Sequence, residues 1–213
     1  LQHLSRGEAS WQPNDEAAVL LHPRPDLMAY IVMLQTQDHE GLQRELLKIL
    51  SQDGLQRFVT DVVAPLTAMV GDTWARGDLA VHEEHLYTEC VMTLMRQAIL
   101  ALPKPANGGE PSVLLTTFPQ EAHGLGLLMV ESLLTLQGCR CVSLGTQTPV
   151  RDIAQAAMAH RADVVALSFS ANMKPNPVLD GLTEFNLLLP ASSQIWVGGQ
   201  ASVLRRRQIE RVL

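Results

Sequence analysis

The chain has 213 residues, a formal net charge of −6, 46% apolar residues and 18% charged residues. This length suits one large or two small domains, and the apolar content is sufficient for buried cores. The negative charge argues against nucleic-acid binding by this segment itself. No apolar run reaches the length of a membrane span and no secretory signal is visible, so we expect no membrane partner.

The cysteine pattern bears on the compartment. Cys90, Cys139 and Cys141 do not have the spacing of a metal site, and the last two would point to one face of an expected strand, where core packing is favoured over a disulfide. This usage fits a reducing environment, and we expect a cytoplasmic protein. Because the chain begins with Leu1 rather than Met, we also expect a fragment of a longer protein.

The N-terminal half has a helical pattern after a polar start. Residues 1–25 contain several prolines and no sustained apolar period, which predicts a tail or linker. Apolar residues then recur at helical spacing in four stretches that begin near residues 26, 38, 54 and 80. Four antiparallel helices with short connections predict a four-helix bundle over residues 26–102.

Several residues mark the expected helix ends. Asp26 and Asp38 can cap the first two helices, and Gly54 can open the third. Pro65 predicts a bend within the third helix, and Gly77 can end it.

A different pattern follows the linker Pro103–Pro111, in which short apolar runs alternate with helical ones. Strands are expected at 112–117, 139–144, 162–169 and 194–197, and helices near 123–137, 149–160, 176–188 and 200–212. This alternation predicts a second domain over residues 112–213, a parallel sheet with helices on both faces. The most apolar run, 162–169, is expected to be a buried central strand.

The segment Glu121-Ala-His-Gly-Leu-Gly126 places a histidine after the first expected strand, at the start of a helix. Ligands of open α/β sheets bind beyond the carboxyl ends of the strands. His123 could bind a metal there, with Glu121 holding its other ring nitrogen. Gly124 and Gly126 allow the backbone to pass close to a bulky group. Alone, such a His is more often a helix cap or a surface residue.

Two further motifs follow at defined distances. From Gly126, 41 residues precede Ser168-Phe-Ser170, and 27 more precede Gly198-Gly199. Over roughly residues 112–200, this order and spacing resemble the cobalamin-binding fingerprint of methionine-synthase-like Rossmann domains, D/E-x-H-x-x-G, S-x-L/S/T and G-G. The resemblance implies a Rossmann-like sheet that binds cobalamin.

The same resemblance assigns roles to single residues. It implies that His123 replaces the nucleotide base as the lower axial ligand of cobalt, with Glu121 as its hydrogen-bond partner; the family more often has Asp there. It also implies that the motif residues Ser168, Ser170, Gly198 and Gly199, together with Gly126, lie around the cofactor, the Ser and Gly-Gly loops lining the tunnel for its nucleotide tail.

A second motif lies upstream, where nine residues separate Trp74 from Glu84-His85. It is similar to a motif in the helical-bundle domain of the light-sensing, adenosylcobalamin-dependent MerR-type repressors, the CarH/LitR group. The resemblance implies that Trp74, Glu84 and His85 cover the upper face of the corrin and pack on the adenosyl group. A large aromatic ring can exclude water from such a site. The alternative is a core Trp beside solvated helix charges.

Together the resemblances imply a sensory module of a transcriptional regulator, with adenosylcobalamin between the bundle and the sheet. They imply a homo-oligomer, dimer or tetramer, whose state changes when light cleaves the cobalt–carbon bond, with DNA bound only through a domain absent from this chain. No catalytic residue is expected. The alternatives are a corrinoid carrier protein of a methyltransferase system, in which a smaller aliphatic cap is expected, and a regulator with this fold that does not bind cobalamin.

Other site types fit less well. The glycines near His123 do not have dinucleotide-binding spacing, and no Ser has a partner for nucleophilic catalysis. His82 and His85 lie three residues apart and could hold zinc with Glu89, but exposed pairs of this kind are more often solvated. In the light-sensing group a His can follow the motif Trp. Here Ala75 follows it, so a second cobalt ligand would have to be His85 or His82.

Overall fold

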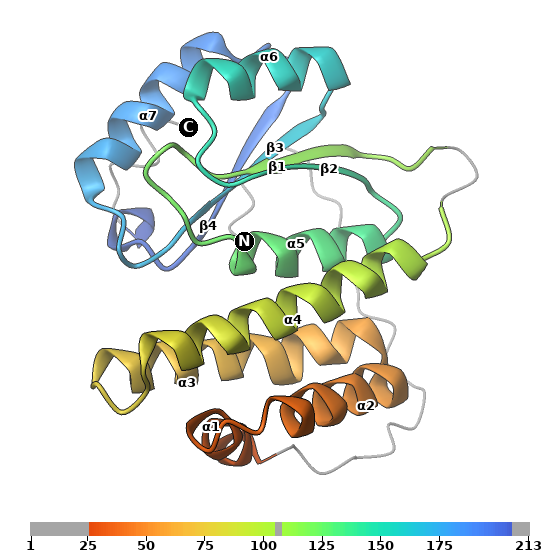
Figure 1. Cartoon of the computed structure of the whole chain (residues 1–213). Helices are drawn as coiled ribbons and strands as arrows, with labels where there is room; N and C mark the ends of the chain where they lie inside the picture. Colours follow the sequence, from red (N-terminus) through yellow and green to blue (C-terminus); the bar gives the residue numbers. More distant parts are fainter. Residues whose placement is uncertain (1–25, 105–107, 206–213) are drawn as a thin grey trace.

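The computed structural model describes residues 26–104 and 108–205. Its elements form stacked layers: the N-terminal helices, then helix α5 (Leu125–Leu136), then the sheet, then helices α6 (Val150–His160) and α7 (Pro175–Leu188) (Figure 1). This arrangement confirms the predicted α/β fold, in which a helical bundle is followed by a parallel sheet with helices on both faces. The expected tail at 1–25, and most of the helix expected at 200–212, lie outside the described residues.

The bundle helices begin and end where local chemistry predicts. They are α1 (Leu27–Gln35), α2 (His39–Arg57), α3 (Ala64–Ala75) and α4 (Val81–Ala101). The backbone of α2 is interrupted at Gly54, with φ of 79° and ψ of 168°, so the third helix opens there as expected. The carboxylate of Asp26 accepts a hydrogen bond from the Met28 N–H at 3.0 Å, and that of Asp38 accepts one from the Gly41 N–H at 2.9 Å. Both are N-caps, as expected. Gly77 follows the end of α3 with φ of 80°, the conformation that favours glycine after a helix.

The bend expected at Pro65 takes the form of a π-helical turn just before it, η1 (Phe58–Val63), which joins α2 to α3. Pro65 has no N–H for the carbonyl four residues earlier, that of Asp61. The Ala64 N–H instead bonds to the Val59 carbonyl, five residues back, which is the π-helical spacing. The proline is therefore accommodated by widening the helix rather than by breaking it.

Helix α5 (Leu125–Leu136) contacts the bundle on one side and the sheet on the other. Leu125 and Leu128 belong to the hydrophobic core of the bundle, whereas Leu127 packs with strands β1 and β3. A helix that is apolar around its whole circumference is typical of a position between two layers. The leucine-rich sequence of α5 thus explains why the two halves of the molecule share a continuous interior.

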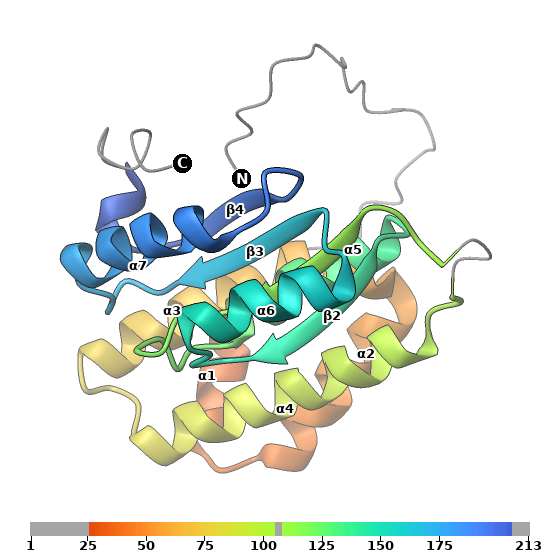
Figure 2. The same cartoon turned by 90° about the horizontal axis from the view of Figure 1, so that it is seen from above.

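The sheet is entirely parallel, with strand order β2-β1-β3-β4. Helices α6 (Val150–His160) and α7 (Pro175–Leu188) cover the face opposite α5 (Figure 2). Its strands are β1 (Ser112–Thr116), β2 (Arg140–Gly145), β3 (Val164–Phe169) and β4 (Gln194–Gly199). β3 lies between β1 and β4 with almost all its residues buried, so the expected central strand is confirmed.

The three cysteines are free thiols. Cys139 and Cys141 both pack in the core between α5 and the sheet, as expected from their spacing. Burial raises the pKa of Cys90 and of Cys141 to about 11, which keeps both thiols protonated at neutral pH. None of the described helices has the length and apolar content needed to span a membrane.

Gly181 in α7 leaves room for the ring of Phe118, the second residue after β1. A Cβ at this position would lie 2.6 Å from Phe118 Cε2. The Phe118 ring packs edge-on against Phe169 and Phe185, with centroids 5.3 and 6.3 Å away. Overpacking costs about 1–3 kcal/mol, more than the roughly 1 kcal/mol that Ala gains over Gly in a helix. Gly181→Ala should therefore lower the free energy of unfolding in urea.

Gly71 provides the matched control for this substitution. It lies in α3, is exposed, and has nothing within 4 Å of the Cβ position. Gly71→Ala should raise the free energy of unfolding by up to about 1 kcal/mol. An equal gain for Gly181→Ala would show that Phe118 moves aside without cost.

Candidate functional site

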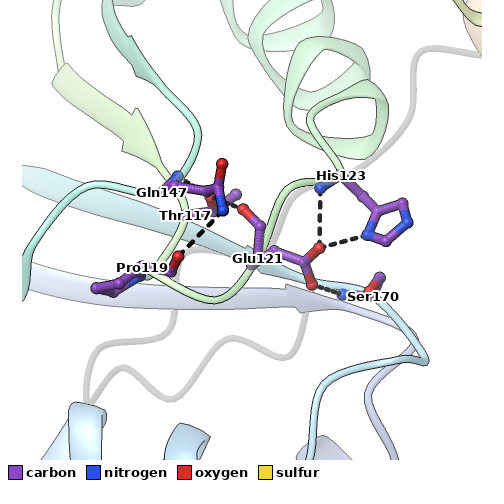
Figure 3. Close-up of polar contacts among 6 residues, drawn as sticks. All are labelled: Thr117, Pro119, Glu121, His123, Gln147 and Ser170. Carbon is purple, nitrogen blue, oxygen red and sulfur yellow. Dashed lines mark hydrogen bonds and ion pairs between the residues drawn. The ribbon is translucent and has the colours of Figure 1, made fainter.

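His123 lies on the loop between β1 and α5, at the carboxyl end of the sheet, where its imidazole is paired with Glu121 (Figure 3). Glu121 Oε1 lies 2.6 Å from His123 Nδ1 and also accepts a hydrogen bond from the His123 backbone N–H at 2.9 Å. The Glu121 side chain is 1% exposed, whereas that of His123 is 60% exposed. The longer arm of Glu, compared with Asp, therefore still reaches the imidazole.

The protonation state follows from this geometry. Burial would raise the pKa of the Glu121 carboxyl, but hydrogen bonds from the His123 and Ser170 backbones outweigh it and hold the pKa below its usual value. The carboxylate is thus ionised at neutral pH and can only accept, so the proton lies on His123 Nδ1. His123 Nε2 then carries a lone pair on the exposed side of the ring, as metal-binding histidines with a carboxylate partner do.

The second oxygen of Glu121 reaches strand β3. Glu121 Oε2 accepts a hydrogen bond from the Ser170 backbone N–H at 2.6 Å. The Ser170 hydroxyl also lowers the Glu121 pKa by its proximity, yet its Oγ is buried and forms no well-aligned hydrogen bond with any described residue.

The structure brings the three parts of the sheet fingerprint together. Ser168 on β3 and Gly198 on β4 are register partners. A Cβ on Gly126 would lie 3.4 Å from Ser168 Oγ, whereas a Cβ on Gly198 would meet nothing within 4 Å. Gly199 has φ of 110°, and its Cβ position is occupied by the Phe169 carbonyl. Glycine at 199 is therefore required by packing, while the space over Gly198 is open.

Trp74 is near the end of α3, and Glu84 and His85 are near the start of α4. This end of the two helices lies on the side of the molecule where the strands end and α5 begins (Figures 1 and 2). Trp74 is close to the end of α3 and is 45% exposed, so it is not a core residue. His85 Nδ1 is 2.7 Å from Glu84 Oε2, and Glu84 Oε1 accepts a hydrogen bond from the Thr88 hydroxyl at 2.8 Å. Both contacts lie within α4, and neither of them uses His85 Nε2.

The other candidate ligand, His82, is engaged differently. Its Nε2 lies 3.3 Å from the amide nitrogen of Gln37, which also donates to Glu83 at 3.0 Å. Within residues 26–104 and 108–205, no group of three or more His, Cys, Asp or Glu side chains could hold a metal ion, so the zinc alternative gains no support. A groove of about 750 Å³ between α1 and α3 contains none of the predicted site residues.

Two residues that the sequence did not single out, Thr117 and Gln147, hold the loop that carries His123. The Thr117 hydroxyl donates to the Glu121 carbonyl at 2.6 Å and accepts from the Gln147 N–H at 2.9 Å. The Gln147 side-chain amide donates to the Pro119 carbonyl at 3.3 Å (Figure 3). The Thr directly after a strand was the available signal for the contacts of Thr117. Nothing in the sequence indicated the contact between the Gln147 side chain and Pro119.

Comparison with known proteins defines the class of this site. Residues 111–211 match a family model described as B12 binding domain, and residues 29–99 match a second model with the same description. The matches cover the sheet and the bundle, respectively. The chain therefore belongs to the B12-binding domain family, and it is a cobalamin-binding module.

Its curated relatives are regulators. The chain is 34% identical over 152 residues to the HTH-type transcriptional repressor CarH of Myxococcus xanthus, a match that covers 71% of this chain and 50% of the relative. It is 38% identical over 91 residues to the HTH-type transcriptional repressor CarA of the same organism, covering 43% of this chain and 31% of the relative. The chain thus spans half or less of these proteins. Both are named as repressors, in agreement with the prediction that this protein is not an enzyme.

A solved structure shows the same fold. The monomethylamine corrinoid protein of Methanosarcina barkeri superimposes with a TM-score of 0.64 and 19% identity, covering 86% of this chain and 87% of that protein. At this identity the likeness concerns the arrangement of helices and strands alone.

Proposed function

We propose that this chain is the adenosylcobalamin-binding sensory module of a light-responsive, cytoplasmic transcriptional regulator that binds DNA through another domain. The observation that carries the proposal is the His123–Glu121 pair. An imidazole with Nδ1 held by a buried carboxylate and Nε2 exposed is suited to bind one metal centre from one side. A corrin would bring its own ring nitrogens to the cobalt, so a single protein ligand would be sufficient.

The residues on the sheet side fit a cobalamin whose nucleotide base has left the cobalt. The buried Ser170 hydroxyl, beside the Glu121 carboxylate, offers a polar group close to His123. The open space over Gly198, next to Ser168 and Gly126, offers room for the nucleotide tail. His123 would hold the cobalt, and these residues would hold the tail.

The residues on the bundle side support the adenosyl form. Trp74 is half-exposed on the same end of the molecule and can cover an upper ligand, and the Glu84 carboxylate can accept hydrogen bonds from ribose hydroxyls. Bound adenosylcobalamin supplies a cobalt–carbon bond that light can break. Loss of the adenosyl group would free Trp74 and Glu84 from the contacts they would make with it, and this would change the surface of the bundle. We propose that this local packing change alters the assembly of a homo-oligomer, a dimer or a tetramer.

The main alternative is a corrinoid carrier protein of a methyltransferase system, which the likeness to the M. barkeri corrinoid protein keeps open. One experiment separates the two functions. Absorption spectra and size-exclusion profiles are recorded for the purified protein with adenosylcobalamin, before and after green light. A sensor should bind adenosylcobalamin in the dark and change both spectrum and size after illumination. Preferential binding of methylcobalamin, with no change in size on illumination, would favour the carrier.

A separate prediction concerns the histidines of the bundle. Ala75 stands where the light-sensing group can have a His, so we expect either a weaker second imidazole ligand from His85 or His82, or water on the cobalt after illumination. His85 has its Nδ1 held by Glu84, whereas the Nε2 of His82 faces Gln37. We expect His85→Ala to alter the absorption spectrum after illumination and His82→Ala to leave it unchanged. An illuminated spectrum with a second imidazole ligand that survives both substitutions would contradict this assignment.

A further inference from the structure

The loop between β1 and α5 is tied to the neighbouring loop between β2 and α6. Thr117, the first residue after β1, is fully buried, and its hydroxyl uses both of its hydrogen-bonding capacities. It donates to the Glu121 carbonyl at 2.6 Å and accepts from the Gln147 N–H at 2.9 Å. The backbone supports the same pairing, because the Thr148 N–H donates to the Thr117 carbonyl at 3.1 Å.

Gln147 adopts an unusual conformation to make these contacts. Its φ is 59°, in the left-handed region that non-glycine residues rarely adopt. In this conformation its backbone N–H points at Thr117, while its side-chain amide reaches the Pro119 carbonyl at 3.3 Å (Figure 3). Strained residues persist where the surrounding structure holds them in place, and they are common near functional sites.

These contacts fix Glu121 from two sides. On one side Thr117 holds its backbone carbonyl, and on the other the Ser170 N–H holds its side chain. The turn between them is closed by a hydrogen bond from the Glu121 N–H to the Phe118 carbonyl at 2.9 Å. Since Glu121 in turn holds the imidazole of His123, a shift of its backbone would move the carboxylate and with it the ring.

We infer that Thr117 and Gln147 are positioning residues for His123, acting through the backbone of Glu121. This inference rests on the proposed role of His123 as the cobalt ligand. The β2–α6 loop does not contact the imidazole. Its Gln147 N–H instead holds the Thr117 hydroxyl, which holds the backbone of Glu121, and the Glu121 carboxylate orients the imidazole. The orientation of His123 thus depends on residues that follow each of the three strands β1, β2 and β3.

The test replaces the bridging hydroxyl with a methyl group. Thr117→Val keeps the volume and removes both hydrogen bonds, whereas Thr117→Ser keeps the hydroxyl. The first readout uses the protein without cofactor: ¹⁵N chemical shifts of the His123 ring report which nitrogen carries the proton. We expect wild type and Thr117→Ser to hold the proton on Nδ1, and Thr117→Val to populate both tautomers. With adenosylcobalamin, Thr117→Val should bind roughly 10-fold more weakly, within the range for partners of metal-bound histidines.

Thr116 provides the matched control. It is equally buried, and its hydroxyl contacts the Thr148 hydroxyl of the β2–α6 loop at 2.8 Å, the Gly145 carbonyl at the end of β2 at 3.0 Å and the Thr117 carbonyl at 3.4 Å. It does not bond to Glu121. Thr116→Val should lower thermal stability and leave the His123 tautomer unchanged. The same tautomer change in both valine variants would overturn the inference, because it would reflect general loosening.

Hydrogen exchange in the wild-type protein keeps the inference testable if Thr117→Val does not fold. The Gln147 amide should be protected although Gln147 is exposed, at a rate similar to that of the His123 amide. Fast exchange at Gln147 beside slow exchange at His123 would overturn the inference. If wild type shows no histidine ligation of cobalamin, the proposed function fails, while the cofactor-free tautomer measurement still decides whether Thr117 positions the ring.

Discussion

Replacing His123 with alanine should remove the signature of histidine ligation from the absorption spectrum of the dark adenosylcobalamin complex. The affinity for cobalamin should fall by at least roughly 100-fold. Removing only the hydrogen-bond partner of a metal-bound His can cost as much, and here the ligand itself is removed. The physical reason is that the exposed Nε2 of His123 is the donor that the buried Glu121 carboxylate holds in place. Spectra and equilibrium dialysis with adenosylcobalamin measure both effects.

A second histidine controls for the substitution itself. His39 is exposed at the start of α2, far along the chain from the site, and its imidazole has no role in our proposal. His39→Ala should leave the spectrum and the affinity unchanged. If His123→Ala gives the wild-type spectrum and affinity, His123 is not the cobalt ligand.

Trp74→Ala should loosen adenosylcobalamin selectively and narrow the gap between its affinity and that of methylcobalamin. The loss for adenosylcobalamin should be roughly tenfold, because an aromatic contact contributes about 0.5–1.5 kcal/mol beyond the area it buries. Methylcobalamin, which lacks the adenosyl group, should lose little. Titrations of the variant with both corrinoids, followed by absorption, measure the two dissociation constants.

The exposure of Trp74 separates this effect from a loss of stability. A buried Trp truncated to Ala costs about 3–5 kcal/mol of unfolding free energy. Trp74 is 45% exposed, so the cost in the cofactor-free protein should be well below that range. Trp74→Phe should retain most of the selectivity. Equal losses for both corrinoids, together with a core-sized loss of stability, would show that Trp74 has a structural role alone.

The sequence predicted the fold and the grouping of the fingerprint because both depend on regular patterns. Apolar runs of strand length, alternating with helices, dictate a parallel sheet, and the carboxyl ends of parallel strands share one edge. Residues placed at those ends, such as Gly126, Ser168 and Gly198, therefore come together whatever the details of the loops. Helix ends were equally predictable where a capping carboxylate marks them, as at Asp26 and Asp38.

Contacts between loops were not predictable, because no periodicity relates their residues. The hydrogen bonds from Gln147 to Thr117 and from Ser170 to Glu121 join positions 30 and 49 residues apart, and they depend on how separate loops fold at the sheet edge. The π-helical turn before Pro65 shows a related limit. The proline indicates that a hydrogen bond is lost, but the packing around the helix decides whether the chain kinks or widens.

The two-sided character of α5 has a mechanical consequence. Because Leu125 and Leu128 complete the interior of the bundle while Leu127 completes that of the sheet, the two halves cannot separate without exposing apolar surface. They should lose their structure in a single cooperative transition. The helix begins two residues after His123, and its leucines belong to both interiors. A shift of the His123 loop should therefore reach both halves through one helix, without a separate linker between them.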